Sequence, residues 1–291
     1  MLRAKAADLL RGRLPEPVKR WARTALGRGA AVEPRLGRRG VVEDLFFWIG
    51  DERHDTVLPL QNYFSVLYPD LDTTTGGTLV LRDALGRVLG RHEFHLRAHG
   101  ITRLRIREVL AAVGARPPEG YGTLRCHLRI PDAVAATLDP LQPFYFWDRF
   151  YIGYVTPPAP PCFVHGVDKT YVADHGAAEP ALFYDAGKRY AWAPEIPVDL
   201  GAYARFSVAV VNRTAAAAAM TLTVTDANDA ARTWSADVAP FGAHRFELDP
   251  ERVRGLAHED LRLHLDGIPT RWGRPVVFKE FANGALSAMH C

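Results

Sequence analysis

The chain has 291 residues, of which 48% are hydrophobic and 24% charged, a composition typical of a soluble globular protein with room for two domains. Residues 1–40 hold eleven Lys and Arg against three Asp and Glu, whereas the rest hold 25 against 30, which argues against nucleic-acid binding by the body. Three cysteines form no secreted disulfide framework, and no apolar run reaches the ~20 residues of a membrane-spanning helix, so we expect a cytoplasmic protein with reduced thiols.

The first forty residues are expected to form a basic amphipathic helical arm and a tether. Apolar residues recur at three- and four-residue spacing on both sides of the break at Pro15 and Pro17, and cations occupy the opposite faces. Residues 27–40 are rich in Gly, Arg and Pro and are typical of a flexible tether. Such an arm can bind an anionic membrane at the inner face or dock on the protein body. The residues expected to carry membrane contact are Leu10, Leu14, Lys19, Arg20, Trp21 and Arg23.

From Val41 onward the pattern changes to short β-branched and aromatic runs separated by Gly, Pro, Asn and Asp, which is typical of antiparallel β-sandwiches. One short helix is expected at 107–113. The expected strands of the first part are 45–49, 63–68, 78–82, 101–106, 124–130 and 144–154. Those of the second part are 206–212, 220–225, 233–238, 243–248, 261–265 and 275–282.

The second part repeats the first in order. The matched segments are 64–66 with 206–208, 78–83 with 221–226, 99–100 with 241–242, 124–128 with 261–265, and 143–148 with 275–280. A repeat spacing above 100 residues is too long for a solenoid and fits a duplicated domain. We therefore expect an all-β protein with tandem duplicated antiparallel β-sandwich domains at 41–184 and 185–291, behind the arm of residues 1–40.

The last hundred residues contain an ordered series of motifs. They are Trp192, Glu195-Ile196-Pro197, an expected strand from Phe206 to Asn212, and a late run from Pro275 to a small-residue tail. With this order, residues 192–291 resemble the bacterial sensory rhodopsin transducer family. The resemblance implies a small β-sandwich and an oligomeric binding or signalling module. It implies no particular functional residues for this chain.

Two groups of polar residues are candidate sites. Cys162, His165, His290 and Cys291 are candidate zinc ligands, because the two copies, aligned at their ends, place His165 opposite His290, and thiolate and imidazole suit zinc. The alternative is buried thiols and a loop histidine. Asp148 and Glu280 align in two aromatic strands and are candidate acid–base carboxylates, or outward residues on alternating strands.

Residues 144–154 are unusually aromatic. Trp147, Tyr151 and Tyr154 are expected at an interface between domains or subunits, with a sugar-stacking platform as the alternative. The sequence holds no Gly-x-Ser-x-Gly, His-Glu-x-x-His or phosphate-loop motif. We therefore expect a non-enzymatic binding or scaffold protein without a cofactor, whose partner is a protein, a second copy, an anionic membrane or a polysaccharide. The alternative is a metal-dependent enzyme with its site between the repeats.

Overall fold

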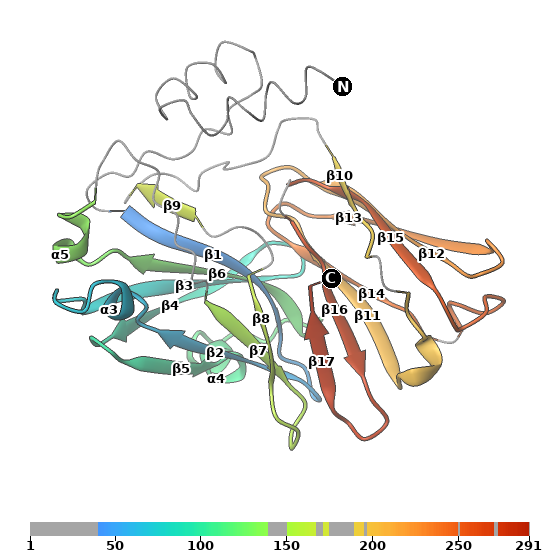
Figure 1. Cartoon of the computed structure of the whole chain (residues 1–291), viewed down its shortest axis with the longest axis horizontal. Coiled ribbons are helices and arrows are strands. Elements are labelled where there is room, and N and C mark those ends of the chain that lie inside the picture. Colours follow the sequence, from blue (N-terminus) through green and yellow to red (C-terminus); the bar gives the residue numbers. More distant parts are fainter. Residues whose placement is uncertain are drawn as a thin grey trace, which may run out of the picture.

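The computed structural model describes residues 40–138, 150–166, 171–174, 189–194, 197–249, 251–270 and 273–290. These residues are mostly β-strand, as the sequence predicts, and Figure 1 shows the first half in blue to green beside the second half in orange to red. The strands of the first half are β1 (Gly40–Ile49), β2 (Asp55–Gln61), β3 (Thr75–Asp83), β4 (Val88–Leu96), β5 (Ile101–Arg105), β6 (Tyr121–Arg129), β7 (Tyr151–Val155), β8 (Cys162–His165) and β9 (Tyr171–Asp174).

Helices are few and short in the described part. They are α3 (Phe64–Leu67), α4 (Ile106–Ala112), α5 (Asp132–Ala135) and the 3-10 turn η1 (Leu200–Ala202). The strands of the second half are β10 (Tyr190–Trp192), β11 (Arg205–Val211), β12 (Ala218–Thr225), β13 (Ala231–Val238), β14 (Ala243–Glu247), β15 (Arg262–Ile268), β16 (Val276–Glu280) and β17 (Leu286–Met289).

The strands form four antiparallel sheets, two from each half. Sheet 1 has the order β4-β3-β6-β1-β9 and sheet 2 the order β5-β2-β7-β8. Sheet 3 has the order β10-β15-β12-β13 and sheet 4 the order β14-β11-β16-β17. The strand orders of the two halves correspond. Sheet 2 (β5-β2-β7-β8) matches sheet 4 (β14-β11-β16-β17), with each strand number higher by nine. Sheet 1 without β9 (β4-β3-β6-β1) matches sheet 3 (β13-β12-β15-β10) in the same way.

The correspondence extends to details of the backbone. Asn62 follows β2 and Asn212 follows β11, and each side-chain amide donates at 3.1 Å to a backbone carbonyl, that of Arg97 or that of Ala239. The backbone N–H of Asn62 bonds to Gly100 O, and that of Asn212 bonds to Gly242 O. The residues before these glycines, His99 and Phe241, have φ values of 54° and 57°, a left-handed conformation that is uncommon for residues other than Gly. The two turns are therefore built in the same way.

The predicted strand at 63–68 is wrong. Phe64–Leu67 form α3, and the strand lies earlier, at Asp55–Gln61. Pro59 makes this strand difficult to predict from the sequence, because Pro has no N–H to donate and is rare inside sheets. β2 tolerates it because the ladder with β7 covers only residues 55–57. The predicted helix at 107–113 is confirmed as α4 (Ile106–Ala112), and β4 (Val88–Leu96) is absent from the predicted strands.

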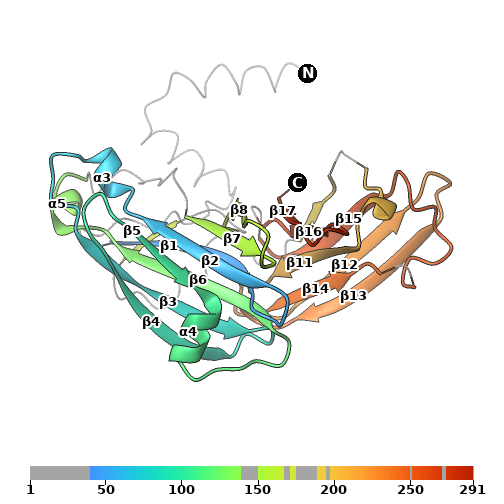
Figure 2. The same cartoon turned by 90° about the horizontal axis from the view of Figure 1, so that it is seen from below.

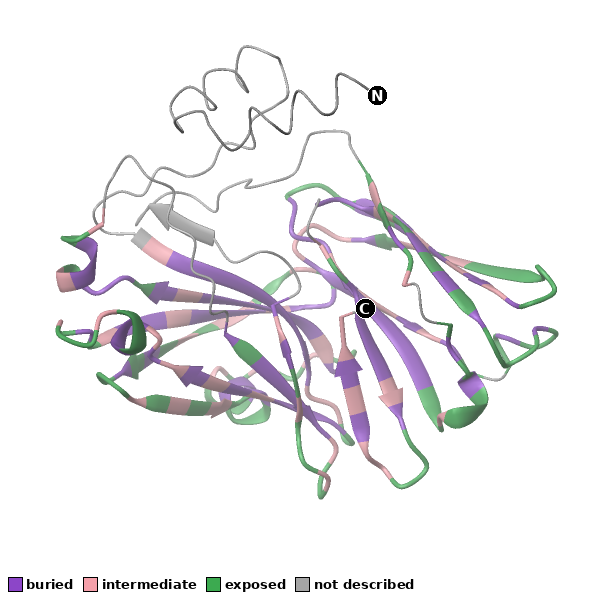
Figure 3. Ribbon diagram, in the orientation of Figure 1, coloured by how far each residue is buried: buried purple, intermediate pink, exposed green. Residues whose placement is uncertain are grey.

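Sheet 4 is covered on both faces. Phe206, Val208, Val210, Phe246 and Val277 belong to the core of the second half. On the opposite face, Ala209, Ala243, Val276, Phe278, Leu286 and Ala288 belong to the core cluster of the first half. Figure 3 shows β11 and β16 largely in the colour of buried residues, and Figure 2 shows both strands between the two halves. The halves therefore share one continuous apolar junction.

Candidate functional site

The structure describes only some of the residues that the sequence singles out. Asp148, Trp147, Cys291 and the arm residues Leu10, Leu14, Lys19, Arg20, Trp21 and Arg23 lie outside the described residues. Glu280 is described, but its equivalent in the first half is not Asp148. Glu280 pairs with Arg205 on β11 as Val155 pairs with Asp55 on β2, so the register places Val155 at the position of Glu280.

Glu280 lies in a polar cluster at the junction of the two halves. It forms an ion pair with Arg53 from the loop between β1 and β2. Its second carboxylate oxygen lies 3.5 Å from Nε2 of His54, whose side chain is 4% exposed. Nδ1 of His54 lies 2.9 Å from both carboxylate oxygens of Asp51. His54 therefore sits between a carboxylate of its own loop and a carboxylate of the second half.

The histidine in this cluster resembles only part of a catalytic arrangement. A carboxylate that accepts from Nδ1 orients a histidine, as in hydrolytic triads, but catalysis also requires a nucleophile or substrate at the other nitrogen. In this protein the other nitrogen faces the Glu280 carboxylate, and both side chains are at least nine-tenths buried. The geometry therefore favours a link between the halves over acid–base chemistry.

The ionisation of the Asp51 carboxyl should make the stability of the protein depend on pH. Burial raises its pKa, but hydrogen bonds from the side chain and backbone of His54 outweigh burial and bring the pKa down from 3.8 to about 2. A lowered folded-state pKa contributes stability that is present above the unfolded pKa and is lost as pH falls toward the folded pKa.

We expect Asp51→Asn to lower the free energy of unfolding by a constant amount above about pH 5, because the wild-type carboxyl is then ionised in both states. The difference from wild type should shrink between about pH 4 and about pH 2, as the wild-type carboxyl becomes protonated. Urea unfolding of both proteins at a series of pH values measures this difference in the free energy of unfolding. A difference that stays constant down to pH 2 would contradict the assignment.

The structure brings His165 and His290 together at the ends of β8 and β17. Their rings stack with centroids 4.7 Å apart. Nδ1 of His290 lies 2.8 Å from Pro275 O, and Nε2 lies 2.9 Å from His165 O. Burial lowers the pKa of His290 below its usual value, and the hydrogen bonds to these two carbonyls only partly oppose this effect. Both ring nitrogens therefore face carbonyl oxygens and not an open coordination site.

Cys162, on the same strand β8 as His165, also faces a backbone carbonyl. Its thiol donates to Tyr154 O at 3.4 Å, and burial raises its pKa, which disfavours the thiolate that a metal needs. Within the described ranges, no group of three or more His, Cys, Asp or Glu side chains is arranged to hold a metal. The geometry of Cys162, His165 and His290 thus gives no support to the zinc site, and Cys291 lies outside the described residues.

A second ionic cluster, which the sequence reading did not single out, joins the halves on another side. Glu43 of β1 lies 2.6 Å from Arg213 of the second half and 3.4 Å from Arg125 of β6. The three side chains are no more than 5% exposed. The Arg125 guanidinium also lies over the ring of Phe241, 5.3 Å from its centroid. No local pattern could reveal this cluster, because Glu43 and Arg213 are 170 positions apart.

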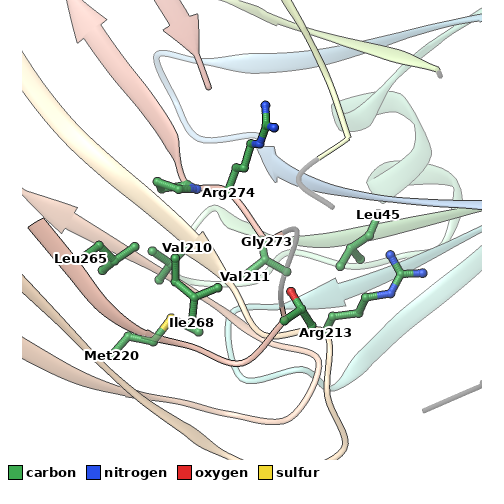
Figure 4. A pocket seen from close by; sticks show the side chains of 11 residues that line it. Leu45, Val210, Val211, Arg213, Met220, Leu265, Ile268, Gly273 and Arg274 are labelled. Carbon is green, nitrogen blue, oxygen red and sulfur yellow. The ribbon is translucent and has the colours of Figure 1, made fainter. Parts of the chain in front are cut away.

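A small cavity lies between Leu45 of β1 and residues of the second half that include Arg213 (Figure 4). Its volume is about 10 Å³, and Leu45, Val210, Met220 and Ile268 are among the residues that line it. A water molecule needs a cavity of at least ~10–15 Å³ on this measure. The cavity therefore cannot hold a ligand larger than one water.

The outward face of sheet 2 is the most exposed apolar surface formed by a described sheet. Tyr151 is 46% and Phe163 48% exposed, and Ile101 at the other edge is 59% exposed. The Phe163 ring lies against the backbone of Gly153, where an added Cβ would come within 2.6 Å of the ring. Tyr154 points the other way: it is fully buried, its hydroxyl donates to Phe47 O at 2.7 Å, and its ring contacts Phe278 of the second half.

This outward face corresponds, position by position, to the junction face of sheet 4. The strand registers place six residues of sheet 2 at the six junction positions Ala209, Ala243, Val276, Phe278, Leu286 and Ala288. These six residues, called the open face below, are Pro59, Ile101, Tyr151, Gly153, Pro161 and Phe163. All six are apolar or glycine. The same face is therefore covered in the second half and open in the first.

Comparison with known proteins gives no relative: no protein-family model matches the chain, and no curated protein sequence matches it. The resemblance of residues 192–291 to the sensory rhodopsin transducer family stays a prediction from sequence. No helix among the described residues is both long and apolar enough to cross a bilayer.

Proposed function

We propose that the protein is a non-enzymatic binding or scaffold protein, built by tandem duplication of a β-sandwich, whose open face on sheet 2 binds a protein partner. The duplication is supported by the identical strand order of sheets 2 and 4 and by the matching turns at His99 and Phe241. The single observation that carries the binding role is the open face itself. Its six positions are buried against another sheet in the second half. In the first half Ile101, Tyr151, Pro161 and Phe163 are exposed and Pro59 is half-buried, while the Phe163 ring covers Gly153.

The open face has the character of a protein interface. Tyr151 and Phe163 are half-exposed rings on adjacent strands, and aromatic residues are enriched at such interfaces. Arg103 and Arg105 lie on the same face at β5, with Arg105 2.9 Å from the buried Asp55. An apolar centre beside a charged edge resembles the core and rim of a protein–protein contact.

A photo-crosslinking amino acid placed at Phe163 tests the binding role. Irradiation of cells that produce the full chain should yield adducts from position 163 and none from Thr223, a matched position on the outer face of sheet 3. The Thr223 hydroxyl bonds to Thr233 on the neighbouring strand. Equal adduct formation at both positions, or none at either, would reject the open face as a binding surface.

The arm adds a second element to the proposal: residues 1–26 bring this cytoplasmic protein reversibly to anionic membranes. The first 40 residues carry a net charge of +8 and the remainder a net charge of −5, so an anionic surface attracts the arm first. Each cation near such a surface contributes about 1 kcal/mol, and apolar residues such as Trp21 add insertion.

We expect full-length protein to sediment with vesicles that contain anionic lipid, and sedimentation to fall as salt is raised, because ions screen the attraction. Replacing Leu10 and Trp21 with Glu should abolish the binding without changing the melting temperature. Equal sedimentation of the full chain and of a chain that starts at Val41 would rule out the membrane role of the arm.

A further inference from the structure

We infer that the partner on the open face is a second copy of this chain, bound face to face about a twofold axis. This inference rests on the proposed binding role and names its partner. The first argument is the equivalence with the junction. At the same six positions the protein already buries a sheet face against another sheet of the same chain, so this face of the fold packs stably against a sheet.

The second argument is the lack of another suitable partner surface among the described sheets. The outer face of sheet 3 is hydrophilic, with cross-strand hydroxyl pairs such as Thr221 with Ser235 and an exposed His264–Asp266 pair. The outer face of sheet 1 is covered along β1 and β6 by sheet 4, where Phe47 of β1 contacts Phe278. Among the described sheets, the open face of another copy is therefore the apolar surface that fits.

The third argument is charge. Arg105 lies on β5, at one edge of sheet 2, and Phe163 lies on β8, at the other edge. The two residues share one row, because Arg105 pairs with Val57, Val57 with Gly153, and Gly153 with Phe163. A twofold axis that runs along the strands places β5 of one copy over β8 of the other. Arg105 then faces the Phe163 ring of the partner instead of a second Arg105, and a guanidinium over an aromatic face is attractive. Arg103, two positions earlier on β5, then faces the row of His165 beside that ring. A single self-complementary contact closes at two subunits and leaves no open end.

The test measures the molar mass of the full-length chain by light scattering after size-exclusion chromatography. Wild-type protein should have twice the mass of one chain. Phe163→Arg should give the mass of a single chain, because two pairs of guanidiniums then oppose each other. Thr223→Arg on sheet 3 is the matched control and should keep the doubled mass. Circular dichroism shows whether each variant is folded.

A charge-reversal pair keeps the inference falsifiable even if one variant folds poorly. Adding Arg103→Glu to Phe163→Arg should restore the doubled mass, because each new guanidinium then lies diagonally opposite a carboxylate of the partner, one row away and within reach of both long side chains. A single-chain mass for wild type, or a doubled mass for Phe163→Arg, overturns the inference. Failure of the second change to restore the dimer overturns the arrangement with β5 over β8. Adducts at position 163 with another protein, together with a single-chain mass, overturn the second copy and leave the binding role standing.

Discussion

Replacing Glu43 with Ala should lower the free energy of unfolding by about 3–5 kcal/mol, the range observed when one partner of a buried ion pair is removed. The carboxylate is contacted by Arg213 at 2.6 Å and by Arg125 at 3.4 Å, and all three side chains are almost completely buried. Glu43→Gln should cost less, because an amide oxygen can still accept a hydrogen bond.

Denaturant unfolding measures this change, and the surface pair of Glu251 with Arg254 provides the control. Those side chains are 82% and 75% exposed, so Glu251→Ala should leave the unfolding midpoint almost unchanged. If Glu43→Ala were as mild as Glu251→Ala, the buried cluster would not hold the halves together.

Phe278→Ala should produce the second large loss, about 3–5 kcal/mol, as is usual when a buried aromatic ring is removed. Phe278 is 2% exposed and belongs to the second half by sequence but to the core of the first half by contact. Its ring lies 5.7 Å from that of Phe47 and 4.8 Å from that of Tyr154, in edge-to-face geometry with the latter. The cavity left behind would lie at the junction of the two halves.

Calorimetry on Phe278→Ala and Phe281→Ala separates a junction effect from the general cost of losing a ring. Phe281 lies three positions away, is 38% exposed and contacts Tyr203 within its own half. Its removal should change the melting temperature far less. Equal shifts for the two variants would show that the Phe278 ring has no special role at the junction.

The sequence predicted the fold class better than the positions of individual residues. Alternation in residues such as Thr221, Leu222 and Thr223 marks a half-buried strand without reference to distant residues, and β12 lies where this pattern predicts it. Identical short sequences did not always have the same backbone structure. Phe64 and Phe206 begin the same three-residue sequence, but the first lies in a helix and the second in a strand. A helix of one turn is decided by tertiary contacts, here the burial of Phe64 and Ser65.

The candidate sites depended on contacts that no local pattern encodes. Its place in an aromatic strand makes Glu280 a candidate, but its partners Arg53 and His54 lie more than 220 positions earlier in the chain. Tyr151 and Tyr154 looked alike in the sequence, yet their positions on β7 turn one ring to solvent and the other into the core. The open face could be recognised only after the strand registers had placed Phe163 and Ala288 at equivalent positions.

The double covering of sheet 4 has a consequence for the dynamics of the chain. β11 and β16 are its two inner strands, hydrogen-bonded to neighbours on both sides and packed on both faces. Their amide protons can reach solvent only when both cores open, so they should exchange with deuterium at the rate of global unfolding. Edge strands such as β4 and β13 can fray locally and exchange sooner. The slowest-exchanging amides would then lie where the two halves meet and not at the centre of either half.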